Sequence, residues 1–147
     1  MILVRIVGML LPMALMGGMT TLGASSEIEE GRRLFRVHCQ ACHGKSAQGD
    51  GAMKERLDTV PADLTTLAER NHGEFPQDEV YAIIDGRREV PTHGNREMPV
   101  WGFTFQSSGP DPDQEQVVRG MVEALTRYLE SIQVAIAEGS EDSATKR

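Results

Sequence analysis

The sequence predicts an all-α fold of a few helices joined by long loops, and three observations favour it. Apolar residues recur with a helical period in several segments, and no segment shows the alternation typical of a strand. No internal repeat is visible. Outside the first 24 residues, only about a third of the residues are apolar, which is low for a globular domain. Since two cysteines cannot form a disulfide network, a metal or a large prosthetic group is expected to complete the core.

Residues 1–24 have the composition of an export signal. Sixteen of them are apolar, Arg5 is the only charged residue, and small residues dominate the stretch from Gly17 to Ala24. This pattern predicts a secretory signal peptide cleaved near residues 23–26. The alternative is an uncleaved membrane anchor, although Pro12 and the glycines weaken a spanning helix. Either interpretation places the rest of the chain outside the cytoplasmic membrane, in a bacterial periplasm.

The remainder of the chain is acidic and has the length of one domain. The whole chain has a formal net charge of −7, and removal of Arg5 with the first segment leaves −8. No basic stripe is present, which argues against a nucleic-acid partner. We expect one domain over residues 25–137, followed by a flexible polar tail over 138–147.

The first half of this domain is predicted to contain two helices. Ser26 and Glu29 form a capping-box pattern that would open a helix running to about His38. Residues 44–60 are rich in Gly, Lys and Asp and predict a surface loop. A short helix is expected after Pro61, ending at about Asn71 and burying apolar residues, namely Leu64, Leu67 and Ala68.

Two further helices follow. One is predicted to begin near Pro76 and to end at Gly86, with Val80, Ile83 and Ile84 on one face. Residues 86–112 predict a long loop, a kind of segment that is usually functional or disordered. The longest helix is then expected over residues 114–137, capped by Asp113. Its predicted apolar stripe consists of Val117, Met121, Leu125, Tyr128, Ile132 and Ile136.

The motif that carries chemistry is Cys39-Gln40-Ala41-Cys42-His43, which has the C-x-x-C-H spacing of a c-type haem attachment site. Two thiols three positions apart at a helix end can reach the two vinyl groups of one porphyrin, and His43 then faces the iron. A thiol-disulfide exchange motif would follow a strand, a zinc site would need a second ligand pair, and a Cys39–Cys42 disulfide would constrain little. We therefore predict one covalently attached haem c with His43 as an iron ligand.

The other side of the iron has several candidate ligands. Met98 is favoured because Pro99 keeps it out of a helix, so its thioether can project from an extended segment. Met121 lies on a predicted core stripe, Met53 lies in a solvent-facing loop, and His38 shares the proximal side of the ring. His93 and an open position remain alternatives. The favoured interpretation of His93 is a solvent-facing loop residue, and the same applies to His72.

These residues resemble the class I c-type cytochromes, specifically their small bacterial periplasmic members, over roughly residues 27–137. In that family an N-terminal helix crosses a C-terminal helix, and Gly31 with Phe35 fits the first while Leu125 with Tyr128 fits the second. The resemblance implies Met98 as the distal ligand. It also implies that the Pro61 carbonyl receives the His43 ring N–H. Trp101 would pack at the haem edge or donate to a propionate, or would simply pack in the core.

The resemblance implies a one-electron carrier, and no general acid, base or nucleophile is needed, so we expect no enzymatic activity. The expected partners are a periplasmic dehydrogenase, a membrane cytochrome complex or a terminal oxidase. The alternatives are a dedicated cytochrome c subunit of a dehydrogenase or oxidase complex, and a haem enzyme or gas sensor with an open distal site. Arg87, Arg88 and Arg96 would form a docking patch or pair with propionates, or be balanced by Asp85, Glu89 and Glu97.

Overall fold

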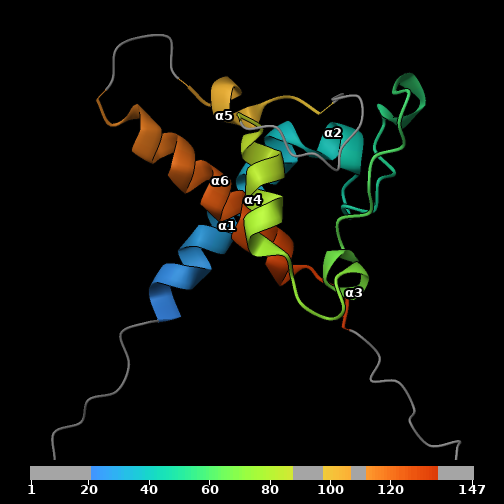
Figure 1. Cartoon of the computed structure of the whole chain (residues 1–147), viewed down its shortest axis with the longest axis horizontal. Helices are drawn as coiled ribbons and strands as arrows, with labels where there is room; N and C mark the ends of the chain where they lie inside the picture. Colours follow the sequence, from blue (N-terminus) through green and yellow to red (C-terminus); the bar gives the residue numbers. More distant parts are fainter. Residues whose placement is uncertain (1–20, 88–97, 107–111, 136–147) are drawn as a thin grey trace, which may run out of the picture.

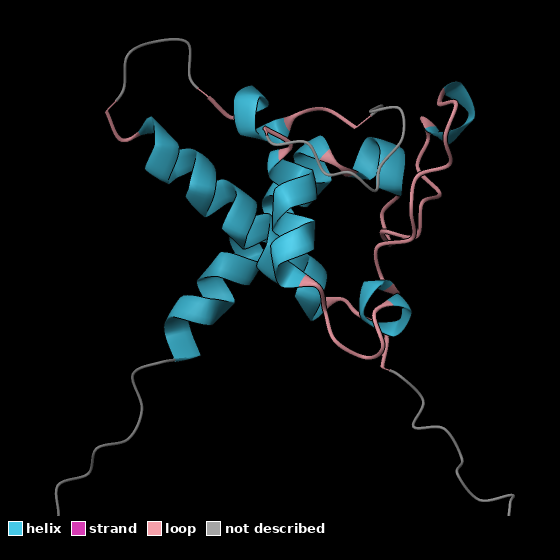
Figure 2. Cartoon of the chain, in the orientation of Figure 1, coloured by secondary structure: helices cyan, strands magenta, loops and turns pink. Residues whose placement is uncertain are grey.

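Two long helices cross at the centre of the molecule. The computed structural model describes residues 21–87, 98–106 and 112–135. Helix α1 (Thr21–His38) and helix α6 (Gln114–Ser131) form an X, and α4 (Gln77–Asp85) lies over the crossing (Figure 1). The described residues contain helices, loops and no strand (Figure 2), so the all-α prediction is confirmed.

The crossing depends on a glycine. A Cβ atom on Gly31 would collide with the carbonyl oxygen of Ala124 and would lie 2.7 Å from the Cβ of Tyr128. Beside this contact the rings of Phe35 and Tyr128 pack with centroids 5.4 Å apart and planes inclined by 50°. The close approach predicted from Gly31, Phe35 and Tyr128 is therefore confirmed, and only a residue without a side chain permits it.

The buried face of α6 differs from the predicted stripe. Val118 and Val122 are fully buried, Leu125 is almost fully buried, and Val117 is 51% exposed. Only part of the stripe was placed correctly, because α6 packs against both α1 and α4 and its buried face is set by the two together. Ile136 lies outside the described residues.

Helix α6 also ends at Ser131, six residues earlier than predicted. The cause is a set of contacts made by the chain just beyond it. The Gln133 side chain donates to the Leu64 carbonyl (2.8 Å) and accepts from the Ala68 N–H (2.9 Å). The Val134 N–H donates to the Thr65 carbonyl (2.9 Å). These bonds take the chain away from the helix axis and tie its end to the segment after Pro61.

The shorter elements follow the predictions in part. Helix α4 ends as expected at Gly86, which has a left-handed φ of 64°. Helix α3 (Leu67–Arg70) begins later than predicted but stops at Asn71, and the loop over 44–60 contains one short 3-10 turn, η1 (Lys54–Arg56). The predicted loop over 86–112 contains a one-turn helix, α5 (Trp101–Thr104), that the sequence did not indicate.

The predicted start of the first helix is wrong. The described residues are helical from Thr21 onward, and the Ser26 hydroxyl donates to the Gly23 carbonyl (2.8 Å) inside the helix instead of capping it. A serine inside a helix commonly makes this backward bond.

Residues 1–20 and the tail lie outside the described residues, and no helix among those described is long and apolar enough to span a bilayer.

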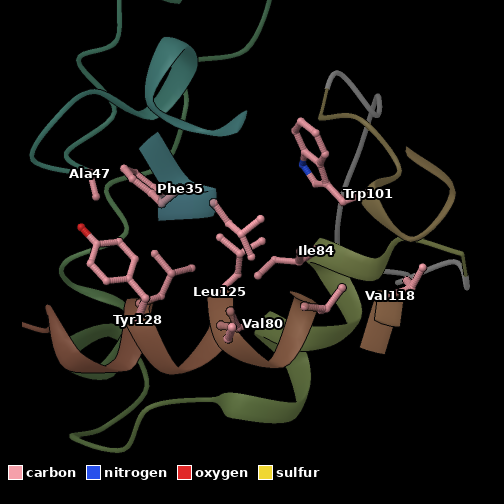
Figure 3. Packing of buried hydrophobic residues seen from close by; sticks show 12 residues of the cluster. Phe35, Ala47, Val80, Ile84, Trp101, Val118, Leu125 and Tyr128 are labelled. Atoms are coloured by element: carbon pink, nitrogen blue, oxygen red, sulfur yellow. The ribbon is translucent and has the colours of Figure 1, made fainter. Parts of the chain in front are cut away.

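The core lies between α1, α4, α5 and α6 (Figure 3). It is built mainly from aliphatic side chains, with Phe35, Tyr128 and Trp101 as its aromatic members. Cys39 and Met98 are partly buried and pack against this cluster. The core therefore reaches both segments that carry the predicted haem ligands and attachment points.

Candidate functional site

Cys39, Cys42 and His43 share one helical turn. Helix α1 ends at His38, and α2 (Gln40–His43) follows directly. The N–H groups of Cys42 and His43 both donate to the Cys39 carbonyl, at 3.1 and 2.9 Å. Both cysteines are free and partly buried. The turn therefore presents two thiols one turn apart and an imidazole next to the second thiol.

The imidazole of His43 is oriented by a backbone carbonyl. Its Nδ1 lies 3.2 Å from the Ala62 carbonyl oxygen, to which the Nδ1–H donates. Burial lowers the pKa of His43, and the bond to Ala62 opposes this shift. A neutral ring with its Nδ1–H engaged leaves Nε2 as the free nitrogen, which is the state that ligates metals.

The carbonyl predicted for this role was that of Pro61, and that expectation needs correction. The Pro61 carbonyl faces Gly49, where an added Cβ would collide with its oxygen. Ala62, one residue later, supplies the acceptor. Successive carbonyls in an extended segment point in different directions, so the sequence indicated the segment correctly but not the residue.

Burial and the neighbouring Cys42 raise the pKa of the Cys39 thiol to about 12, burial being the larger cause. The thiol is therefore protonated at neutral pH. Catalytic cysteines of thiol-disulfide exchange proteins have the opposite shift, because their reactive form is the thiolate. The environment of Cys39 does not favour that alternative.

The glycine-rich loop over residues 44–60 packs against the back of this turn. The Gly49 N–H donates to the His43 carbonyl (2.9 Å), and the Gly51 N–H donates to the Cys42 carbonyl (3.2 Å). A Cβ on Gly51 would collide with that same Cys42 carbonyl. The predicted surface loop thus satisfies carbonyls at the end of α2, and its glycines permit the close contact.

Met98 remains the candidate for the second iron ligand. It is partly buried and packs against the core, whereas Met53 is 37% exposed on the loop whose backbone contacts α2. Met121 is partly buried on α6, as expected for a core residue. His72 is exposed, and His93 lies outside the described residues.

Trp101 packs in an aromatic cluster with Phe105 and His38. Its ring stacks on Phe105 at 5.4 Å with planes inclined by 28°. The His38 ring contacts both edge-on, with centroids 5.3 Å from each. His38 is thus bound to the segment after Met98. No sequence signal beyond its position before Cys39 could have revealed this contact.

Arg87 is held in an ion-pair network. Its guanidinium lies 2.8 Å from Asp85 and 2.6 Å from Glu115, and these carboxylates raise the pKa of Arg87. Arg87 is therefore balanced by acidic neighbours, which was one of the two arrangements expected for it. Arg88, Arg96, Glu89 and Glu97 lie outside the described residues.

The side chains of the candidate site fit a haem. Two free thiols, an imidazole with Nε2 available and a partly buried thioether are the donors that c-type haem attachment and axial ligation use. The apolar core also extends to Cys39 and Met98, as the environment of a porphyrin requires.

Comparison with known families agrees with this geometry. Residues 26–108 match the family described as "Cytochrome C oxidase, cbb3-type, subunit III". The chain belongs to this family. No curated protein and no solved structure is similar enough to count as a match.

Membership in the family confirms several expectations. The chain is a c-type cytochrome of the monohaem, class I-like kind, and its family implies haem c with iron and haem-based electron transfer. It also indicates association with an oxidase or other redox partners. The matched range includes the attachment turn, Ala62, Met98 and Trp101.

Proposed function

We propose that this chain is a one-electron carrier of the periplasm, with one haem c attached covalently through thioethers to Cys39 and Cys42. The observation that supports this most strongly is the attachment turn. It presents two free thiols on one helical turn, next to an imidazole whose Nδ1–H is engaged by Ala62.

In this proposal His43 and Met98 would be the two side chains that hold the iron. When bound, the haem supplies a one-electron couple between ferrous and ferric iron. Ala62 fixes the tautomer and orientation of His43, and the Met98 thioether favours the ferrous state and raises the reduction potential. Since the two side chains leave no position for a substrate, we expect no enzymatic activity.

The test is replacement of Met98 by Ala in the haem-loaded protein. We expect loss of the weak far-red absorption band that arises from sulfur-to-iron charge transfer in the ferric state. Met53→Ala and Met121→Ala are the matched controls and should retain the band. Retention of the band in Met98→Ala, with its loss in a control, would assign the ligand to that other methionine.

A second function is favoured by the family match. The family takes its description from a subunit of a cbb3-type cytochrome c oxidase, which suggests a dedicated cytochrome c subunit of a terminal oxidase. Both functions use the same residues and the same electron transfer. Co-purification from the native membrane in a fixed stoichiometry supports the subunit, whereas a monomeric protein in the periplasmic fraction supports the carrier. A carrier forms weak, fast complexes through small interfaces, and these do not survive purification.

The remaining alternative, a haem enzyme or gas sensor, requires an open or easily displaced distal position. Carbon monoxide binding to the ferrous protein distinguishes it. A Met-ligated carrier should bind carbon monoxide poorly at neutral pH, and Met98→Ala should bind it readily. Ready binding by the unaltered protein would favour the sensor or enzyme.

A further inference from the structure

His38 joins the helix that ends at the attachment turn to the segment that carries Met98. It is the last residue of α1 and immediately precedes Cys39. Its ring contacts Trp101 with planes inclined by 61° and Phe105 with planes inclined by 69°, both at centroid distances of 5.3 Å. Trp101 begins α5 and Phe105 directly follows it, so within the described part of the chain these ring contacts join the end of α1 to α5 and its C-terminal flank.

Helix α5 needs such contacts to hold its place. It has four residues, and a helix of one turn is not stable by itself in water, so tertiary packing must fix it. Trp101 is 9% exposed, and Gly102 packs so closely on the Asp85–Arg87 pair that a Cβ there would lie 2.6 Å from Arg87 Nε. One side of α5 therefore rests on α4, and His38 contacts the aromatic side.

The position of α5 sets the position of Met98. Only Pro99 and Val100 separate Met98 from Trp101, and Pro99 fixes its own φ and restricts the backbone of Met98 before it. A shift of Trp101 away from α1 therefore moves Met98 with it. As long as α5 stays against His38, Met98 stays packed on the core, where it lies in the structure.

We infer that His38 is a positioning residue for Met98. Its ring holds Trp101 and Phe105 against the end of α1, and so favours the arrangement in which the Met98 thioether stays seated at the distal side. This inference rests on the proposed ligation by Met98. His38 does not itself touch the iron in this account, and its role is to stabilise the closed distal segment.

The experiment measures how easily a small ligand replaces the thioether. Ferric haem-loaded protein is titrated with imidazole at one fixed pH, and the loss of the sulfur-to-iron band gives an apparent Kd. Loss of one aromatic pair shifts an opening equilibrium by about 2- to 10-fold. Since His38→Ala removes two such contacts, we expect its imidazole affinity to rise about tenfold, while the band is retained without imidazole.

Two control variants separate positioning from general destabilisation. His38→Phe keeps a ring that can pack edge-on and should stay within about twofold of the unaltered protein. Leu129→Ala creates a cavity in the core of α6 and should lower the free energy of unfolding by about 2–5 kcal/mol, with little change in imidazole affinity. If His38→Ala does not load haem, His38→Leu keeps the volume without the ring and should show the same increase.

The outcomes distinguish this inference from the proposed ligation by Met98, on which it rests. Unchanged imidazole affinity in His38→Ala overturns the inference, as does an equal increase in His38→Phe or in Leu129→Ala. The proposed ligation has its own test, because Met98→Ala must lose the band. If Met98→Ala loses the band and His38→Ala binds imidazole normally, the proposed function stands and the positioning role of His38 is wrong.

Discussion

The attachment side of the site and its distal side are held by different kinds of contact. Around His43, main-chain hydrogen bonds from Gly49 and Gly51 satisfy the carbonyls at the end of α2, and Ala62 engages the imidazole. On the distal side, α5 is held by ring contacts and by packing of one glycine on an ion pair. Main-chain bonds fix atoms closely, whereas ring contacts tolerate sliding.

The difference indicates which ligand can give way. A ligand fixed by several backbone bonds should remain when the protein is perturbed, and a ligand on a segment that leads into a one-turn helix should be displaced first. The proximal side would then keep the haem in place while the distal side adjusts. The predictions that follow are ordered from the largest expected effect to the smallest.

The largest effect is expected from removal of both attachment thiols. The double variant Cys39→Ser, Cys42→Ser should yield haem-free and largely unfolded protein, because a ligand that binds only the folded state contributes its binding free energy to stability. Absorbance measures haem loading and circular dichroism measures helix content. Recovery of a folded haem-free domain would contradict the view that the cofactor completes the core.

A pair of glycine variants compares the two sides directly. Gly51→Ala places a methyl group against the main-chain carbonyls of Ala41 and Cys42, which cannot move without disturbing the attachment turn. Gly102→Ala places one against the side chains of Asp85 and Arg87 and 2.7 Å from the Asp85 carbonyl oxygen, where the side chains and a one-turn helix can shift. We expect Gly51→Ala to lower the free energy of unfolding by about 1–3 kcal/mol, and Gly102→Ala to lower it less.

The same pair should behave in the reverse order when imidazole binding is measured. Gly102→Ala should raise imidazole affinity of the ferric protein, since it pushes α5 away from α4, whereas Gly51→Ala should leave it nearly unchanged. Gly120→Ala is the control, because nothing lies within 4 Å of a Cβ at that helical position. Equal effects of Gly51→Ala and Gly102→Ala in both measurements would remove the distinction between the two sides.

The smallest effect is expected at the ion pair that supports α5. Arg87 lowers the pKa of Glu115, chiefly through a direct hydrogen bond. A carboxyl whose pKa is lowered on folding stabilises the folded state above its unfolded pKa of about 4.3, and this stabilisation is lost as the pH falls through the folded pKa. Unfolding measured against pH should show Glu115→Gln slightly less stable than the unaltered protein at pH 7.

That difference should close as the pH falls below about 4. In an Arg87→Gln background, Glu115→Gln should have a smaller pH-dependent effect, because the main partner that lowers the pKa of Glu115 is gone and only the charge of Arg119 still lowers it. A difference between the two proteins that persists in acid would show that Glu115 acts by packing and not by its charge.

The grouping of Cys39, Cys42 and His43 at a helix end could be predicted from the sequence, and the structure places them on one helical turn. The C-x-x-C-H spacing is local, and a local motif needs no knowledge of distant packing. The crossing at Gly31 was also expected, because the resemblance to the class I c-type cytochromes implies it and Gly31 with Phe35 fits the family's first helix. Helix α4 followed from its period and from Gly86 at its end.

The remaining features depend on contacts between distant segments. The acceptor for the His43 ring is the carbonyl of Ala62 and not that of Pro61. Helix α6 ends where the Gln133 side chain bonds to Leu64 and Ala68, and the period of apolar residues does not indicate this end. The sequence indicated only that His38 shares the proximal side of the ring, and not its ring contacts, because its partners lie more than 60 residues further along the chain. The prediction that Val117 would be buried is wrong for the same reason, since α1 and α4 together define the buried face of α6.

The central claim is one haem c with both axial positions filled by side chains of this chain. An optical spectrum of the purified protein, in the ferric and ferrous states and with carbon monoxide added, tests it most directly. The account predicts a low-spin ferric haem with a sulfur-to-iron band, and a ferrous form that carbon monoxide alters little. A high-spin ferric spectrum and immediate carbon monoxide binding would contradict the account.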